Sequence, residues 1–228
     1  MDLGDYMSDY EKLKEFWNSN KVEPERIEGR WVENEVFNRV VEQGLRDSEL
    51  VLDYGCGFGW GLFEMSFIGG FKKGVGIDTS VNSIDYCRRT AELSGMENLE
   101  FLCGDEKLLD GYKDGFDFIL TVNTLDVIPQ EVCDSIMERL SASLKSGGRI
   151  AICLNPEFSD EGFREVGMDM VGRYGYKDGV FRCNRKSHEE WIEYFSKYLR
   201  FVEFDTFYLS EGEKKFPSRM MFLLGKKV

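Results

Sequence analysis

Residues 51–60, with the sequence VLDYGCGFGW, constrain the fold more than any other stretch of this chain. A short apolar run ends in Asp53, and glycines then occupy the alternate positions 55, 57 and 59. This pattern predicts a buried strand that breaks into a tight loop before a helix. In an open α/β sheet the first such turn lies at the carboxyl edge of the strands, where ligands bind. We therefore expect this glycine loop to form one wall of a ligand site, since glycine lets backbone approach a ligand closely.

The glycine loop does not fit the dinucleotide fingerprint G-x-G-x-x-G. Counted from Gly55, the sixth position is Trp60, and counted from Gly57 it is Leu62. The missing glycine argues against a nicotinamide-dependent dehydrogenase. Asp53 argues against a pyrophosphate ligand as well, because a carboxylate beside the loop attracts a cation and repels a phosphate.

The segment Asp53-x-Gly55-x-Gly57-x-Gly59 closely resembles motif I of the class I S-adenosylmethionine-dependent methyltransferases. The resemblance implies a Rossmann-like α/β fold, a doubly wound and mostly parallel seven-stranded sheet with helices on both faces. It also implies S-adenosylmethionine as the cofactor and S-adenosylhomocysteine as the product. The resemblance covers residues 45–228, strongly to about residue 153 and in outline beyond it.

Two further predicted strands, residues 74–78 and 99–103, also end in or beside acids. Asp78 follows Gly59 at close to the offset of about 20 residues at which an acid meets ribose hydroxyls in nucleotide-binding folds. A carboxylate can accept from both hydroxyls at once, so Asp78 is expected to hold the ribose, with Thr79 beside it. The resemblance implies that an acid after the third strand binds the adenine amino group, a role for Asp105 in which the adjacent Glu106 competes.

The fourth predicted strand, residues 116–120, leads into a loop at residues 121–126. The resemblance implies that side chains of this loop face the methyl group and the acceptor, which makes Thr121 and Asn123 candidate cofactor ligands. Asp126 is the candidate catalytic residue, because it lies where many relatives place a histidine, and a carboxylate there could take a proton or hold an amine. The alternative is an acid that caps the helix predicted to begin at Pro129.

The candidate cofactor ligands share a position at the carboxyl ends of the first four predicted strands. They are Asp53, Gly55, Cys56, Gly57, Gly59, Asp78, Thr79, Asp105, Glu106, Thr121 and Asn123, and no metal ligand is expected. Asp53 has an alternative role as an anchor for backbone amides of the loop. His188, the single histidine, begins a predicted helix and reads as a surface residue, which weakens any mechanism based on a histidine base.

The chain divides into an N-terminal helical cap, residues 1–45, and a methyltransferase-like domain, residues 46–228. A polar, glycine-rich stretch at about residues 155–186 is longer than an ordinary connection and is expected to be a lid-like insertion. Ser187 and Glu190 form a predicted capping box. Apolar runs at residues 201–209 and 220–224 are expected to be the last two strands, one of them antiparallel at or near the sheet edge.

The composition of the chain limits which kinds of acceptor are expected. The chain has 29 Lys and Arg against 42 Asp and Glu, a net charge of −13. Such a surface repels phosphate backbones, so a nucleic-acid acceptor is disfavoured.

The six cysteines form no C-x-x-C pair, which indicates reduced, mostly buried thiols. No run has the length of a transmembrane helix and no signal peptide is visible, so a cytoplasmic enzyme without membrane association is expected. The sequence gives no prediction of oligomeric state.

The expected function is methyl transfer from S-adenosylmethionine to an N, O or S atom of a small-molecule acceptor. The alternatives are a nucleic-acid or protein methyltransferase and a non-catalytic domain that binds S-adenosylmethionine. Methyltransferases that modify exocyclic amines carry an N-P-P-Y-like motif after the fourth strand, where this chain has Thr-Val-Asn-Thr at residues 121–124. The related sequence Asn-Pro-Glu-Phe, at residues 155–158, comes one strand later.

Overall fold

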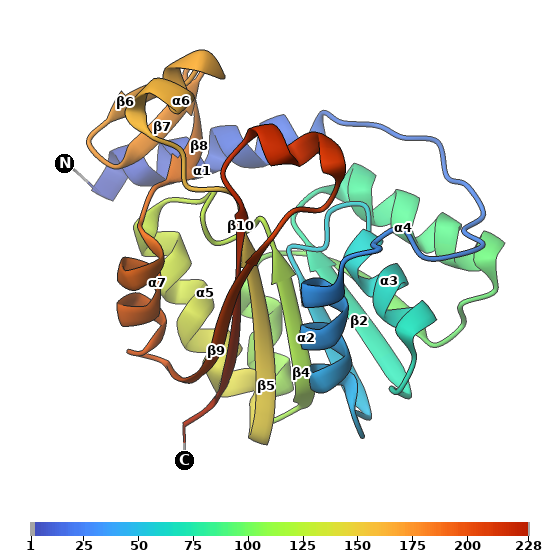
Figure 1. Ribbon diagram of the computed structural model, residues 1–228. Helices are drawn as coiled ribbons and strands as arrows, with labels where there is room; N and C mark the ends of the chain where they lie inside the picture. The colour runs from blue at the N-terminus through green and yellow to red at the C-terminus, as the bar shows by residue number, and fades with distance from the viewer. Residues whose placement is uncertain (1–2, 228) are drawn as a thin grey trace.

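A seven-stranded sheet forms the centre of the computed structural model, which describes residues 3–227 (Figure 1). The strands are β1 (Leu50–Tyr54), β2 (Lys73–Asp78), β3 (Leu99–Cys103), β4 (Phe116–Val122), β5 (Leu144–Leu154), β9 (Leu199–Phe207) and β10 (Arg219–Lys226). Their order is β3-β2-β1-β4-β5-β10-β9, with β1 to β5 parallel and β10 antiparallel to both neighbours. The predicted doubly wound sheet is confirmed, including an antiparallel strand near one edge.

Helices cover both faces of this sheet. One face packs against α2 (Glu35–Leu45), α3 (Trp60–Ile68) and α4 (Val81–Ser94), and the other against η1 (Glu106–Tyr112), α5 (Gln130–Ser143) and α7 (His188–Phe195). Each face has its own core of buried side chains, around Phe37 and Phe63 on the first and around Trp191 and Phe195 on the second. A parallel strand buried on both faces has a nearly continuous apolar sequence, and in β4 only Asp117 and Thr121 are polar.

Side-chain caps fix where several helices begin. The side-chain oxygen Asn34 Oδ1 accepts from Val36 N at the start of α2. The Ser80 hydroxyl accepts from Ser83 N at the start of α4. Ser187 and Glu190 form the predicted capping box of α7, which is confirmed. These caps satisfy backbone amides that have no partner within a helix.

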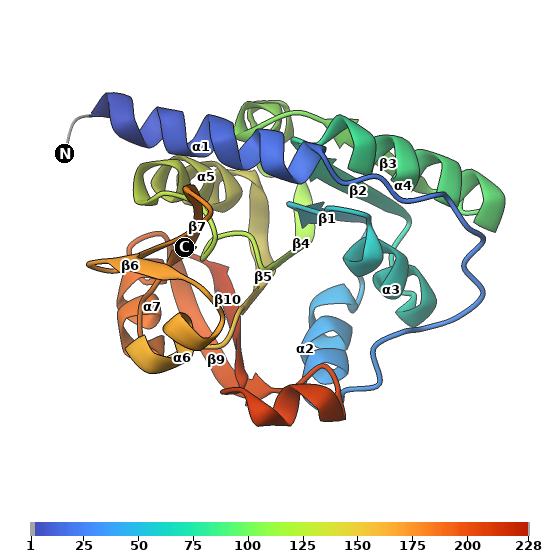
Figure 2. The same ribbon diagram turned by 90° about the horizontal axis from the view of Figure 1, so that it is seen from above.

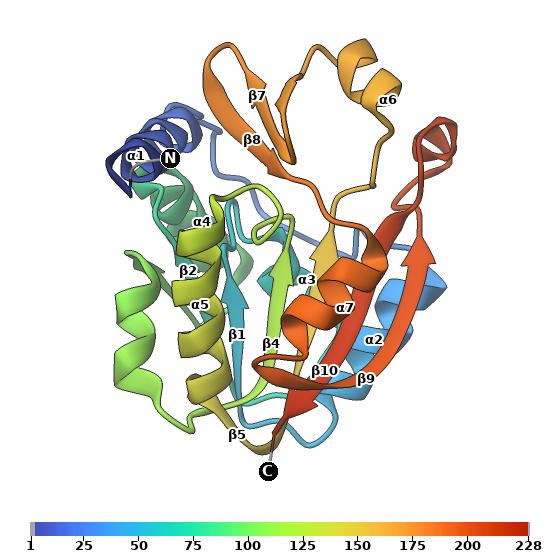
Figure 3. The same ribbon diagram turned by 90° about the vertical axis from the view of Figure 1, so that its left-hand side faces the viewer.

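Two segments lie above the carboxyl ends of the strands (Figures 1 and 3). The first is α1 (Leu3–Asn18), which Figure 2 shows running along one side of this end of the sheet. The second is the stretch predicted as an insertion, which contains α6 (Asp160–Glu165) and a small antiparallel sheet of β6 (Asp169–Val171), β7 (Tyr174–Lys177) and β8 (Val180–Asn184). The two segments touch, because the Arg182 guanidinium lies 3.3 Å from the centroid of the Phe16 ring. The connection between β9 and β10 contains η2 (Glu211–Lys215).

No helix among the described residues is both long and apolar enough to cross a membrane.

Candidate functional site

A cavity of about 270 Å³ opens at the carboxyl ends of β1, β2 and β4. Its walls come from the glycine loop after β1, the end of β2, the loop after β4, and α1. Six of the residues predicted from the sequence line it: Gly55, Cys56, Gly57, Asp78, Thr79 and Asn123. Because these residues come from three separate strands, the sheet topology brings them together as the sequence pattern implies.

Two glycines of the loop have different roles, Gly57 at the cavity and Gly59 in the packing of α3. Gly57 has φ +51°, and no atom lies within 4 Å of the place where a Cβ would stand, so its bare backbone faces open space. Gly59 has φ +78° and precedes the first turn of α3. A Cβ on Gly59 would lie 2.8 Å from the Phe63 ring and 2.9 Å from Cys87 Sγ. Gly57 therefore admits a ligand, whereas Gly59 lets the helix pack against the core.

Asp78 is fixed at the tip of β2 by two backbone amides. Its Oδ2 accepts from Gly57 N at 2.9 Å and its Oδ1 accepts from Ser80 N at 2.8 Å. Burial raises the pKa of this carboxyl, and the backbone donors act in the opposite direction. Each carboxylate oxygen has a further lone pair, so the side chain can still accept hydrogen bonds from a ligand in the cavity.

The other acids predicted for the site approach the same edge but do not line the cavity. Asp105 Oδ1 accepts from Lys107 N at the start of η1, and Glu106 Oε1 accepts from the Ser135 hydroxyl at 3.1 Å. Burial of the Tyr10 hydroxyl, followed by the charges of Glu106, Asp105 and Asp78, raises the pKa of Tyr10. Gly104 is the residue that reaches the cavity from the end of β3.

Asp53 lies behind the glycine loop. Its side chain is buried, and its Oδ2 accepts from Leu62 N at 2.9 Å in the first turn of α3. Burial raises the pKa of this carboxyl to about 7. Because Asp53 does not line the cavity, the geometry favours the anchoring role that the sequence left open.

Thr121 and Asp126 also lie outside the cavity lining. The Thr121 hydroxyl is buried in β4 and has no hydrogen-bond partner among the described residues. Asp126 Oδ2 accepts from Asn155 N at 2.9 Å and from Asn155 Nδ2 at 3.0 Å, and Asp126 Oδ1 has no partner among residues 3–227. Burial raises the pKa of the Asp126 carboxyl. Pro129 is the residue before α5, and no side-chain cap of that helix occurs in the part of the chain that the structure describes, so the alternative of a capping role for Asp126 is wrong.

One wall of the cavity comes from α1, which lies within the stretch predicted as an N-terminal helical cap. Tyr10, Leu13, Lys14 and Trp17 line the cavity, and Asn18 ties the end of the helix to α4 by accepting from Asn82 N at 3.2 Å. Aromatic residues at helical spacing are more often core residues, so the sequence pattern alone did not decide between a core role and a place in the cavity wall for Trp17.

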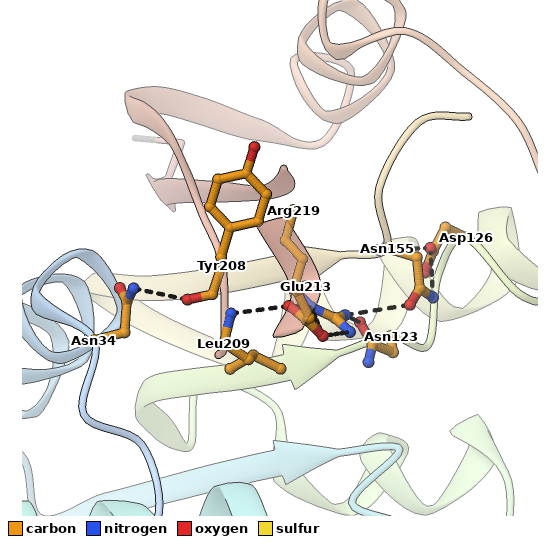
Figure 4. A network of polar contacts seen from close by, with 8 residues as sticks. All are labelled: Asn34, Asn123, Asp126, Asn155, Tyr208, Leu209, Glu213 and Arg219. Carbon is orange, nitrogen blue, oxygen red and sulfur yellow. Dashed lines mark hydrogen bonds and ion pairs between the residues drawn. The ribbon is translucent and has the colours of Figure 1, made fainter. Parts of the chain in front are cut away.

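Sequence reasoning missed a polar network behind the loop after β4. Arg219, from the start of β10, donates to Asn123 Oδ1 at 3.0 Å, and the network continues through Asn155 to Asp126 (Figure 4). Glu213 accepts from Arg219 on another side of the guanidinium. The contact between Arg219 and Asn123 joins residues 96 positions apart, and no sequence motif marks Arg219.

The fold and the cavity at its carboxyl edge define the class I methyltransferase architecture. An S-adenosylmethionine-dependent methyltransferase from Methanosarcina mazei superposes with a TM-score of 0.67 at 17% identity, covering 83% of this chain and 97% of that one. Another from Mesorhizobium loti gives a TM-score of 0.59 at 15% identity, covering 84% and 96%. At these identities the likeness shows the fold.

The family model described as methyltransferase domain matches residues 45–165, more than half of the chain. The chain therefore belongs to the methyltransferase-domain family, and S-adenosylmethionine is the cofactor of its class. A curated relative, demethylmenaquinone methyltransferase of Lactococcus lactis subsp. lactis, is 29% identical over 105 residues. That match covers 46% of this chain and 40% of the relative's length.

The cavity fits this cofactor. Gly57 leaves room for a ligand against the backbone, Asp78 presents two acceptor oxygens, and the acidic surroundings suit a cation. No phosphate-binding arrangement is needed, since S-adenosylmethionine carries no phosphate group.

Proposed function

We propose that this methyltransferase transfers the methyl group of S-adenosylmethionine to an N, O or S atom of a small-molecule acceptor. The observation that carries the proposal is the Asp78 carboxylate, which lines the cavity while Gly57 N and Ser80 N fix it in place. A carboxylate held in this way can accept hydrogen bonds from both ribose hydroxyls of the cofactor. Gly57, Gly55 and Cys56 supply backbone along the same wall.

The remaining predicted residues support this wall in the proposal. Asp53 holds the first turn of α3, Asp105 begins η1, and Asp126 ties the loop after β4 to the start of the insertion. Since Asp126 is buried behind Asn155, its geometry favours positioning over proton transfer.

The protein's part in catalysis is alignment and exclusion of water. The bound cofactor supplies a sulfonium methyl group, which is already a strong electrophile. Trp17 and Lys14 on α1 line the cavity, so they limit the access of water to a bound ligand. Holding the acceptor atom in line with the methyl group then supplies most of the rate enhancement.

Three observations support a small-molecule acceptor. The net charge of −13 disfavours a nucleic acid. Side chains of Trp60, Val127 and Ile128 give the cavity apolar walls, which are typical of sites for small organic ligands. The name of the curated relative gives demethylmenaquinone as its acceptor, which is a small molecule.

Calorimetric titration tests the cofactor assignment. S-adenosylmethionine and S-adenosylhomocysteine should bind and NAD should not. Asp78→Ala should weaken S-adenosylmethionine binding about tenfold or more, because hydrogen bonds to a charged group are lost. Asp85→Ala, on the exposed side of α4, is the matched control and should bind as the wild type does. Equal affinity of the Asp78 variant and the wild type would refute the ribose assignment.

Acceptor class requires a separate experiment. Cofactor labelled in the methyl group is incubated with the protein and with a metabolite extract, RNA or a protein mixture. Label should appear in the small-molecule fraction. Label that appears only in RNA or only in protein would contradict the proposal.

A further inference from the structure

The Arg219 guanidinium joins the loop after β4 to the loop before β10. Its Nη1 donates to Asn123 Oδ1 at 3.0 Å and to Asn155 Oδ1 at 3.2 Å. Its Nη2 donates to Glu213 Oε1 at 2.7 Å and its Nε to Glu213 Oε2 at 3.0 Å. The Arg219 side chain is only 12% exposed, so these contacts are largely shielded from water.

Glu213 keeps the guanidinium in a single orientation. Two parallel N–H···O bonds to one carboxylate fix both the position and the plane of an arginine. Glu213 Oε2 is itself held by Leu209 N at 2.9 Å. Since both ends of this pair are fixed, Nη1 is aimed at the two asparagines and not free to turn elsewhere.

This arrangement decides which way the Asn123 amide points. A guanidinium has donors only, so it can face the oxygen of an asparagine and not the nitrogen. Figure 4 shows the Asn123 nitrogen on the side away from Arg219. The backbone of Asn123 is fixed too, with φ +52° and its N–H donated to Cys153 O at 2.8 Å. Within residues 3–227, Asn123 Nδ2 has no hydrogen-bond acceptor, and Asn123 lines the cavity.

The position of Asn123 indicates which part of a ligand it meets. The loop after β4 packs directly on the glycine loop, since a Cβ on Gly55 would lie 2.3 Å from Thr124 Oγ1. Asp78, the proposed ribose ligand, lies on β2, on the other side of β1 from β4. A cofactor whose ribose binds Asp78 and which extends along the glycine loop therefore brings its amino acid end toward Asn123. That end carries the cofactor's carboxylate, an acceptor that an amide N–H suits.

We infer that Arg219 is a positioning residue, which holds Asn123 so that Asn123 Nδ2 donates a hydrogen bond to the carboxylate of the bound cofactor. The inference rests on the proposed function and adds to it a residue from the last strand of the sheet. Asn155, at the start of the insertion, also accepts from Arg219 and donates to Asp126 in the loop after β4.

Two ligands that differ in the amino acid end, which carries the carboxylate, test the inference by calorimetry. S-adenosylhomocysteine has the amino acid end, and 5′-methylthioadenosine lacks it while retaining the nucleoside and the sulfur. Asn123→Asp keeps an acceptor for Arg219, tolerates the positive φ and places a carboxylate oxygen where the donor was. Arg219→Gln removes the guanidinium, and Arg149→Gln, at an exposed position toward the opposite end of β5, is the control.

Asn123→Asp and Arg219→Gln should each weaken S-adenosylhomocysteine binding about tenfold or more, and leave 5′-methylthioadenosine binding within about twofold of the wild type. Arg219→Gln should have no further effect in an Asn123→Gly background, because Arg219 acts through Asn123. Asn123→Asp should retain the wild-type melting temperature, since Arg219 keeps its partner. Arg219→Lys should restore part of the affinity lost in Arg219→Gln.

Three results would overturn the inference while leaving the proposed function intact. They are unchanged S-adenosylhomocysteine affinity in Asn123→Asp, equal loss of both ligands in that variant, and independent losses in the Arg219→Gln, Asn123→Gly double variant. Failure of the wild type to bind either nucleoside would instead refute the proposed function, and the inference with it.

Discussion

The free energy of unfolding of Asp53→Asn, relative to that of the wild type, should be higher at pH 8 than at pH 5.5. Burial raises the pKa of Asp53 in the folded protein to about 7, from the ordinary value of 3.8 in the unfolded chain. Between these two values the unfolded chain has lost a proton that the folded protein keeps, so the free energy of unfolding falls as pH rises. Each pH unit in that window costs about 1.4 kcal/mol. Above about pH 7 both states are ionised and the cost stays constant.

Urea unfolding at the two pH values measures the effect, without added cofactor. From pH 5.5 to the folded pKa the wild type loses about 2 kcal/mol through this carboxyl. Asparagine cannot ionise, and its carbonyl oxygen can still accept from Leu62 N. The difference in unfolding free energy between Asp53→Asn and the wild type should therefore move by about 2 kcal/mol in favour of the variant between pH 5.5 and pH 8. Other titrating groups cancel in this difference.

Asp117→Asn is the matched control because the pKa of Asp117 shifts in the opposite direction. Burial alone would raise the pKa of Asp117, but donors at Leu50 N, Lys145 Nζ and Glu49 N outweigh burial and lower it. Asp117 therefore stabilises the fold above pH 3.8, and this contribution is lost only in stronger acid. Asp117→Asn should destabilise the protein equally at pH 5.5 and pH 8. A pH-independent difference for Asp53→Asn, or one of opposite sign, would refute the reasoning.

Three further predictions address the loop, the core and α1. Gly59→Ala should lower the free energy of unfolding by about 2 kcal/mol or more, because of backbone strain and clashes with the core. Gly57→Ala should lower it by about 1 kcal/mol and should also weaken S-adenosylmethionine binding. Urea unfolding measures stability and calorimetry measures binding, and equal stability of the two variants would contradict the separate roles of Gly57 and Gly59. Arg30→Met should cost about 2 kcal/mol in urea unfolding, because the fully buried Glu64 loses a partner at 2.7 Å, and Glu64→Gln in that background should recover part of the loss. Amide hydrogen exchange in residues 10–18 should slow when S-adenosylmethionine is added, since α1 lines the cavity; unchanged exchange would place the ligand away from α1.

The parts of the fold that the sequence predicted are those with a local signal. The strands β1 to β3 are apolar runs that end at or next to acids or glycines, and the predicted bounds of β3 match the structure. Asp78 reaches the cavity because the end of a parallel strand and the loop after it are fixed by short-range geometry.

The insertion contained a signal that sequence reasoning did not use. Residues 155–186 are polar and glycine-rich, and the sequence analysis predicts an insertion there without naming strands. The structure shows that this insertion contains β6, β7 and β8. Asp178-Gly179 lies between β7 and β8, and both residues have positive φ, at 53° and 72°. An Asp-Gly pair between alternating apolar residues is a strong hairpin signal.

The parts that could not be predicted depend on contacts distant in the chain. The periodicity of α1 shows that it is a helix but not which surface it covers. Arg219 reaches Asn123 only because β10 pairs with β5 in a register that places Met220 opposite Leu154, next to Asn155. Register of this kind follows from the packed sheet, and no spacing in the sequence encodes it.

A crystal structure with bound S-adenosylhomocysteine tests the central claim most directly. The account predicts that both ribose hydroxyls lie within hydrogen-bonding distance of the Asp78 carboxylate, with the nucleoside between the glycine loop and α1. A nucleoside bound outside this cavity, or a ribose turned away from Asp78, would contradict it.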